Sequence, residues 1–549
     1  MILLLFGYLT IHQLEYEIHK GESIEVPVPP RITRLIPREK GLKRFVFGYY
    51  PYWNGDWYTR FRYDLLNHIA YFCVDLHPDG SLGEIPNPSI LKSLTDLAHR
   101  NGVGVSITAV NFSQSEIDRF LASAQARSRA IHNLKTMVET LALDGVNIDL
   151  EFPSASVRDY LVTFMKDLTD TIHALSPLNI VTIATPAVDW WGSFDYHRLS
   201  SVTDGLFIMA YDYYWSGSSH AGPVAPLRSS SLWGPYSDSW TVNDYLNKGA
   251  DPNRLLLGVP YYGYRWPTET GGLKARTTGS GVARIYATLA DSAEKYGKRW
   301  EDRSKTVWYR KYTNQWYQAW FDDSLSLSLK YQLVIDSLLF GAGIWALGYD
   351  RSRTELWGAI ETAFGRNRRD ARFVDFAIPD TMAVGETALI WIKVENTGNL
   401  IWPDSGSTNP YRIGAGSIGN GNPHDNQFPW FDFQYGGYSN HLLDQRAYLG
   451  DSVFPDSTHT LTFKIEAPRI EGRYWFEARM VCDGVGWFGP PLSHQIVVVR
   501  VAVAEGKGGS KRREGPIYYD ILGRKVTRIV RSGIYFEKKG KLRKIVVIR

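Results

Sequence analysis

The segment Asp144-Gly-Val-Asn-Ile-Asp-Leu-Glu151 contains the residues of this chain that are best placed for catalysis. Side chains alternate between two faces of a β-strand, so Asn147, Asp149 and Glu151 would share one face. The other face would carry the apolar residues Val146, Ile148, Leu150 and Phe152. Polar groups directed into a protein interior are costly unless they have partners or a function. Carboxyl groups in such a place serve enzymes as general acids and bases. A structural hydrogen-bond network, or a strand on another surface, is the alternative.

The elements around this segment predict a (β/α)8 barrel of the α/β class. Eight short β-branched and aromatic runs alternate with amphipathic stretches such as 157–175, which has apolar residues at helical spacing. The eight runs are 45–50, 68–74, 102–110, 145–152, 179–186, 205–212, 255–264 and 341–350. A doubly wound open sheet is the alternative, but eight evenly spaced units favour closure. We therefore place a barrel at 45–365, with a small inserted subdomain at 265–340.

The regions outside the barrel have other patterns. Residues 1–44 read as a leader: a weak match to a signal peptide, or a disordered start, followed by a proline-containing spacer. Residues 373–502 alternate short strands with turns, which predicts an all-β sandwich. Residues 515–549 form a small β module after a Gly- and Lys-rich linker.

Composition excludes several classes of protein. No apolar run reaches the roughly 18–20 residues that span a bilayer, so we expect no membrane span. Residues 505–549 carry 14 Lys+Arg and 4 Asp+Glu, which leaves a net charge of −6 on the first 504 residues. We therefore expect no nucleic-acid partner. The 2 cysteines, Cys73 and Cys482, are too few for a disulfide scaffold, and the 13 histidines show no metal-ligand spacing. We expect free thiols, no metal site and no cofactor.

The segment 144–151 resembles the DGxDxDxE signature of glycoside hydrolase family 18, the chitinases and their relatives. Four other stretches support the resemblance in the same order along the chain. They are Phe47-Gly-Tyr49-Tyr50, Ser106 on the third run, Met209-Ala-Tyr211-Asp212 on the sixth, and Trp345 on the eighth.

The resemblance implies a fold and a set of roles. Glu151 is expected to be the general acid, and Asp149 to orient the substrate's own acetamido group, which attacks the anomeric carbon. Tyr211, Asp212 and Met209 would hold that group from the sixth strand. Trp345 would form the floor under the sugar, and Tyr49 and Ser106 would brace the network beneath Asp149.

Asn147 departs from the family pattern, because the first of the three acids should stand there. Asparagine can hydrogen-bond Asp149 but cannot accept a proton or repel it, so we expect a shifted pH optimum and not a loss of activity. The variant resembles bacterial members that act on peptidoglycan. Residues 316–330, with Asp322, Asp323 and Lys330, resemble a segment of the same members. One of the two aspartates is expected to cap the next helix.

Two further resemblances concern the modules after the barrel. Val394-Glu-Asn396-Thr-Gly398 with Trp402 resembles an immunoglobulin-like accessory domain, which would bind carbohydrate or act as a spacer. Tyr519-Asp-Ile-Leu-Gly523 and the residues after it resemble the C-terminal sorting domain of type IX secretion substrates. Together with the leader, this tail predicts a secreted or cell-surface protein that engages that secretion machinery.

These patterns predict a retaining glycosidase that cleaves β-1,4-linked N-acetylglucosamine polymers, either chitin or peptidoglycan. Two alternatives belong to other classes. One is a non-catalytic, lectin-like barrel; the retention of Glu151 speaks against it. The other is a cell-wall attachment protein whose β modules bind glycan by themselves.

Overall fold

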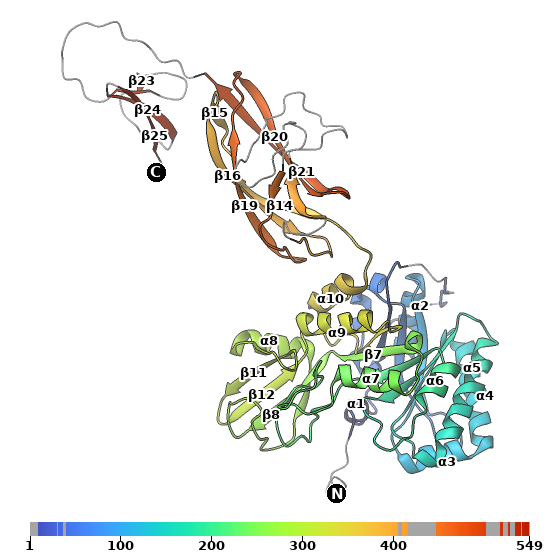
Figure 1. Ribbon diagram of the computed structural model, residues 1–549. Helices are drawn as coiled ribbons and strands as arrows, with labels where there is room; N and C mark the ends of the chain where they lie inside the picture. Colours follow the sequence, from blue (N-terminus) through green and yellow to red (C-terminus); the bar gives the residue numbers. More distant parts are fainter. Residues whose placement is uncertain are drawn as a thin grey trace, which may run out of the picture. The chain divides into compact units, whose positions relative to one another are not determined.

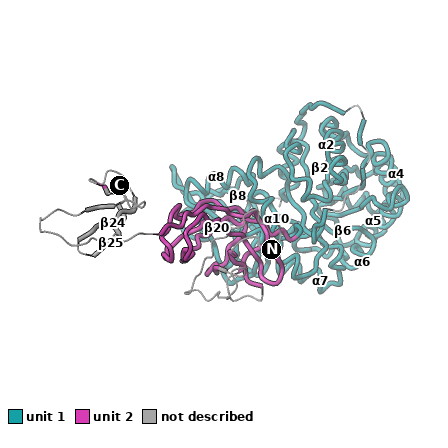
Figure 2. The backbone as a smooth tube through the Cα atoms, turned by 90° about the horizontal axis from the view of Figure 1, so that it is seen from above, with its two compact units in different colours: residues 1–366 teal, residues 367–549 magenta. Residues whose placement is uncertain are grey.

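A computed structural model describes residues 9–29, 31–33, 35–36, 40–403, 409–414, 446–500, 517–519, 525–526, 533–539 and 541–547. The chain divides into two compact units, Met1–Arg366 and Asn367–Arg549, which are coloured separately in Figure 2. Each unit has a hydrophobic core of its own.

The first unit is built on a closed barrel of eight parallel strands, as predicted (Figure 1). Its strands follow the order β1-β13-β7-β6-β5-β4-β3-β2 around the barrel. Their bounds are β1 Phe45–Pro51, β2 His68–Asp75, β3 Gly104–Asn111, β4 Gly145–Leu150, β5 Ile180–Pro186, β6 Gly205–Met209, β7 Leu255–Pro260 and β13 Gly341–Trp345.

Helices connect these strands on the outside of the barrel (Figure 1). They are α2 Pro88–Arg100, α3 Gln114–Ala122, α4 Ala124–Leu141, α5 Arg158–His173, α6 Tyr196–Val202, α7 Asp238–Asn247, α9 Ser324–Asp336 and α10 Glu355–Phe364. Short 3₁₀ turns also occur: η1 Tyr52–Asn54, η2 Trp57–Arg60, η3 Tyr63–Leu65, η4 Ala155–Val157 and η5 Pro252–Arg254. The helix expected within 157–175 is α5.

The inserted subdomain is an antiparallel sheet between β7 and α9. Its order is β10-β11-β12-β8-β9, and α8 packs on it. The bounds are β8 Tyr262–Thr268, β9 Val282–Ile285, α8 Tyr286–Tyr296, β10 Arg299–Glu301, β11 Thr306–Tyr312 and β12 Trp316–Phe321. The insertion is therefore shorter than the expected 265–340 at its far end, because α9 returns the chain to the barrel. Asp323 caps α9 through a capping box with Ser326, as predicted for one of the two aspartates.

Asp322, the other aspartate, has a different role. Its carboxylate lies 2.8 Å from Nζ of the buried Lys330, which also lies 3.2 Å from Asp238 of α7. This cluster joins the insertion to two barrel helices.

The second unit is rich in β-structure. One sheet has the order β14-β16-β19 and another the order β15-β21-β20-β17-β18. Their strands are β14 Ala371–Ala377, β15 Thr381–Ala383, β16 Thr387–Asn396, β17 Tyr411–Gly414, β18 Arg446–Tyr448, β19 Thr458–Glu466, β20 Gly472–Cys482 and β21 Gly486–Val499. A four-stranded sheet follows: β22 Ile517–Tyr519, β23 Lys525–Val526, β24 Gly533–Lys539 and β25 Lys541–Val547. Residues 520–524 of the sorting-like tail, and the linker before it, lie outside the described residues.

Residues 9–29 form more structure than the leader and spacer expected there. Helix α1 (Ile11–His19) begins at Thr10, whose hydroxyl accepts a hydrogen bond from the backbone N–H of Gln13. The expectation of a disordered start does not hold for these residues. None of the helices in the described ranges combines the length and hydropathy needed to cross a bilayer.

Candidate active site

Strand β4 places its polar face inside the barrel, as the alternation predicted. Asn147 and Asp149 are fully buried, and Glu151 directly follows the strand with 6% of its surface exposed. Gly145 permits the close packing at the start of β4, because a Cβ there would lie 2.0 Å from the carbonyl oxygen of Ile180. The two carboxylates thus lie at the carboxyl end of a barrel strand, where (β/α)8 enzymes carry their catalytic groups.

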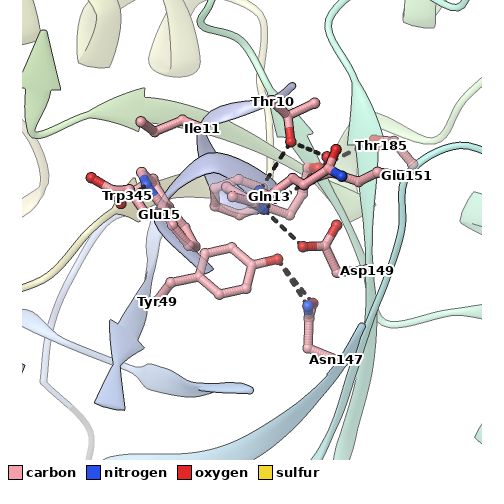
Figure 3. A network of polar contacts seen from close by, with 12 residues as sticks. Thr10, Ile11, Gln13, Glu15, Tyr49, Asn147, Asp149, Glu151, Thr185 and Trp345 are labelled. Carbon is pink, nitrogen blue, oxygen red and sulfur yellow. Dashed lines mark hydrogen bonds and ion pairs between the residues drawn. The ribbon is translucent and has the colours of Figure 1, made fainter. Parts of the chain in front are cut away.

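Asn147 forms the floor of this network together with Tyr49 (Figure 3). Its amide donates to the Tyr49 hydroxyl at 2.8 Å, and its oxygen accepts from Thr182 at 3.1 Å. No hydrogen bond to Asp149 occurs among the described contacts of Asn147, in contrast to what we expected. Ser106 does not brace Asp149 directly either: its hydroxyl lies 2.5 Å from Nε2 of His68.

The end of β6 brings a second group of predicted residues to the site. Met209, Tyr211 and Asp212 are all buried. Asp212 has a φ of 60°, and it accepts hydrogen bonds from the hydroxyls of Tyr262 and, at 3.3 Å, Tyr264. Both tyrosines thus bind Asp212 from β8.

Trp345 ends β13 and lies fully buried beside Tyr49, with ring centroids 5.3 Å apart. The predicted carboxylates, the β6 residues and the tryptophan floor therefore come together in the folded barrel. They come from three strands or strand ends, β4, β6 and β13.

Helix α1 also belongs to this site, and sequence reasoning did not find it. Nδ1 of His12 lies 2.8 Å from Asp149, and Nε2 lies 2.7 Å from the Tyr211 hydroxyl. The Thr10 hydroxyl donates to Glu151. Glu15 accepts hydrogen bonds from Nε1 of Trp345 and from the Tyr349 hydroxyl. The N–H of Ile11 donates to Asp212.

Burial controls the acidity of the carboxyl groups in the site. Burial and the nearby charge of Asp149 raise the pKa of Glu151 to about 7. Burial also raises the pKa of Asp212 to about 7, although hydrogen bonds from Tyr262 and the N–H of Ile11 oppose the shift. A carboxyl group with a pKa near neutrality is protonated often enough to act as a general acid.

The two ionisable groups of α1 are shifted as well. Burial lowers the pKa of His12, but the charges and hydrogen bonds of Asp149 and Glu151 outweigh burial and raise it to about 9. Burial raises the pKa of Glu15 to about 7 against the hydrogen bonds of Tyr349 and Trp345. His12 is therefore an imidazolium at neutral pH, and both of its ring nitrogens donate.

A cavity of about 480 Å³ remains open beside Thr10. It lies over the ends of β4, β5 and β6, and its walls carry aromatic side chains, of which Trp190 and Trp191 are exposed and can pack on planar apolar faces. The aromatic lining residues are Phe152, Trp190, Trp191, Tyr211, Tyr213, Trp215 and Tyr236.

One grouping near the carboxylates has the spacing of a metal site. One ligand atom each from His12, Asp149 and Glu151 lies within 4.8 Å of the others. Local sequence spacing could not indicate this grouping, because His12 lies 137 residues before Asp149. The three groups contact one another directly, since Nδ1 of His12 lies 2.8 Å from Asp149 and 3.3 Å from Glu151.

These features define a (β/α)8 protein with an acid–base site at the carboxyl ends of its strands. The chain belongs to the family described as "Glycosyl hydrolases family 18", whose sequence profile matches residues 45–350, more than half of the chain. The motifs at Tyr49, Glu151, Tyr211 and Trp345 all lie within this match.

Comparison with characterised sequences gives relatives of the barrel. The chain is 28% identical over 253 residues to "Putative sporulation-specific glycosylase YdhD" of Bacillus subtilis, an alignment that covers 44% of this chain and 56% of the relative. It is 25% identical over 300 residues to the "Cortical fragment-lytic enzyme" of Bacillus subtilis, covering 52% of this chain and 65% of that protein. The chain thus spans between half and two thirds of the length of these relatives.

Solved structures share the fold. A chitinase from Rhizomucor miehei is 23% identical and superposes with a TM-score of 0.53, covering 58% of this chain and 99% of its own. At this level of identity the likeness concerns the barrel fold alone.

Proposed function

We propose that the protein is a retaining glycosidase that hydrolyses β-1,4 linkages in N-acetylglucosamine polymers such as chitin and chitooligosaccharides. The observation that carries the proposal is the buried pair Asp149 and Glu151 at the end of β4, gathered with Tyr211 and the Trp345 ring around one side chain, His12. This arrangement contains a proton donor, an acceptor for an amide N–H, and an apolar surface for a sugar ring.

The reaction follows from these positions. Glu151 protonates the glycosidic oxygen while the acetamido oxygen of the substrate attacks the anomeric carbon, so that the C–O bond to the leaving sugar breaks. Asp149 accepts a hydrogen bond from the acetamido N–H and stabilises the cyclic oxazolinium cation. Water then attacks the anomeric carbon, Glu151 accepts its proton, and the configuration is retained. Tyr211 and Asp212 hold the acetamido group in position.

Peptidoglycan is the second candidate substrate. It is favoured by the names of two relatives, a sporulation-specific glycosylase and a cortical fragment-lytic enzyme. Peptidoglycan contains the same 2-acetamido sugars, so the chemistry is unchanged. A lectin-like barrel that only binds such chains is disfavoured, because Glu151 is present with a pKa of about 7.

The proposal extends to location and accessory modules. The leader and the sorting-like tail support export, with the type IX secretion machinery as the partner that reads the tail. The β-rich residues 371–499 support an immunoglobulin-like module that spaces the barrel from a surface or binds glycan. Neither role enters the reaction.

The test is product release from β-1,4-linked N-acetylglucosamine oligomers and, in parallel, from purified peptidoglycan. Glu151→Gln should lower turnover by about 100-fold or more, the usual scale for a lost general acid, while glycan binding persists. Glu139→Gln, on the exposed face of α4, is the matched control. Cleavage of peptidoglycan alone would move the substrate to the cell wall. Wild-type turnover in Glu151→Gln would refute the role of Glu151.

A further inference from the structure

The segment Thr10–His19 lies over the carboxyl ends of the barrel strands and contacts the groups assigned to catalysis. Thr10 bonds to Glu151, Ile11 to Asp212, and His12 to both Asp149 and Tyr211. Ile11 and His12 are fully buried, and Glu15 is 7% exposed. Helix α1 is therefore buried in the site along one whole face.

His12 takes the place that the proposed function gives to the reacting sugar. Its ring stacks on Trp345 with centroids 3.6 Å apart and planes inclined by 26°. At that separation, no second ring fits between the two side chains. The imidazolium presents one N–H to Asp149, as the acetamido N–H of a sugar would, and the other to the Tyr211 oxygen.

The rest of α1 follows one half of the cleft. Tyr16 donates to Asp75 at the end of β2, and the His19 ring stacks on Trp53 at 4.7 Å after β1. The cavity beside Thr10 is on the other side, over β4 to β6. The helix thus covers the half of the cleft next to β1, β2 and β13 and leaves open the cavity over β4 to β6.

The polar contacts of α1 pair a basic ring with two acidic side chains, which distinguishes them from incidental packing. A buried imidazolium is costly unless it is paired and hydrogen-bonded, and His12 has both kinds of partner. Oδ1 of Asp149 has no hydrogen bond among the described contacts, and Oε1 of Glu151 has only the 3.3 Å approach of Nδ1 of His12. A sugar that supplied hydrogen-bond donors to these oxygens could displace the helix.

We propose that residues 10–19 are an internal ligand of the active site, a peptide that must leave before an N-acetylglucosamine chain can bind. The inference rests on the proposed function for the identity of the competing ligand. Because the segment is tethered to the barrel, its effective concentration at the site is high. Substrate binds only the molecules in which the site is free, so its apparent affinity is the intrinsic affinity multiplied by that fraction.

The test compares the full chain with His12→Ala and Glu15→Ala, which remove contacts of α1 and leave the barrel strands intact. Glu17→Ala is the matched control, since Glu17 lies on the exposed face of the same helix. Amide hydrogen exchange is measured for residues 11–19, together with turnover of N-acetylglucosamine oligomers. We expect protected amides in the wild type and in Glu17→Ala, and fast exchange in His12→Ala.

Release of the segment should lower the apparent KM by about tenfold or more and leave kcat nearly unchanged, because saturating substrate displaces the helix in every variant. Unprotected amides in the wild-type chain would overturn the proposal, as would an unchanged KM in a variant whose helix has been released. The proposed function can fail separately. If the α1 amides are protected in the wild type and exchange fast in His12→Ala, but no variant binds or cleaves glycan, the internal ligand is supported and the hydrolase is refuted.

Discussion

At the scale of single residues, Asn147 links strands, and none of its described hydrogen bonds goes to the carboxylates. Its amide group connects Tyr49 of β1 with Thr182 of β5 and has no charge. The like-charge repulsion that a third acid would add at this position is therefore absent. The pKa of Glu151 nevertheless reaches about 7, through burial and Asp149.

Asn147→Asp should restore that repulsion. An additional carboxylate at position 147 makes deprotonation of Glu151 less favourable and raises the pKa of Glu151 further. Because Glu151 must be protonated to act, the alkaline limb of the pH profile of kcat/KM should move to higher pH. The maximum rate should change less than the profile does.

The measurement is the pH dependence of kcat/KM on a soluble oligomer. Asn314→Asp, in an exposed turn of the insertion, controls for the added charge. Superimposable profiles for wild type and Asn147→Asp would mean that position 147 is not coupled to the acid.

At the scale of elements, the barrel strands could be predicted because each run has its own local pattern. The alternation in 145–152 predicted which side chains of β4 point inward, and the structure buries Asn147 and Asp149 as predicted. Neighbouring parallel strands then bring Tyr49, Tyr211 and Trp345 to the same end of the barrel. These conclusions need only short-range periodicity and the geometry of the closed sheet.

Helix α1 could not be placed by the same reasoning. Thr10 is a normal N-cap, so a helix after it is compatible with the sequence. Its partners are distant, however: His12 is 137 residues from Asp149, and Glu15 is 330 residues from Trp345. The inserted sheet was located only approximately for a similar reason, since its strands pair antiparallel across a long segment.

Docking of α1 should weaken as pH rises. The pKa of His12 rises from its ordinary 6.5 to about 9 when the helix is docked, so this contribution is complete below about 6.5 and disappears through about 9. The pKa of Glu15 rises from 4.5 to about 7, so docking also weakens across that interval. The titratable groups that face His12 from the barrel are Asp149, Glu151, Tyr211, Asp212 and Tyr49, and Glu15 faces it from its own helix.

The check is the protection factor of the α1 amides at pH values from about 5 to about 9, normalised to the intrinsic exchange rates. Protection should decrease steadily with pH in the wild type and should be low throughout in His12→Ala. Protection that increases with pH would contradict the charge state assigned to His12.

At the scale of the whole molecule, the two units have separate hydrophobic cores and should unfold separately. Ile392→Ala empties a fully buried position in the core of the second unit and should destabilise that unit by about 2–5 kcal/mol. Calorimetry of the full chain should show one transition lowered and the other unmoved. Turnover of soluble oligomers, measured below the lower transition, should equal that of the wild type.

Leu389→Ala is the control for that experiment, since Leu389 lies on the same strand with 67% of its surface exposed. A single transition that shifts as a whole in Ile392→Ala would show that the units unfold together. Lost turnover would indicate that the second unit supports the barrel.

The two cysteines allow the opening of each unit to be followed separately. Cys73 lies fully buried in β2, and Cys482 is 1% exposed at the end of β20, so each core contains one free thiol. A thiol reagent reaches a buried cysteine only when the surrounding structure opens. Each unit therefore contains its own native reporter of opening. The modification rates of Cys73 and Cys482, measured by peptide mass spectrometry in a single unlabelled sample, would give the opening rates of the barrel and of the β-rich unit.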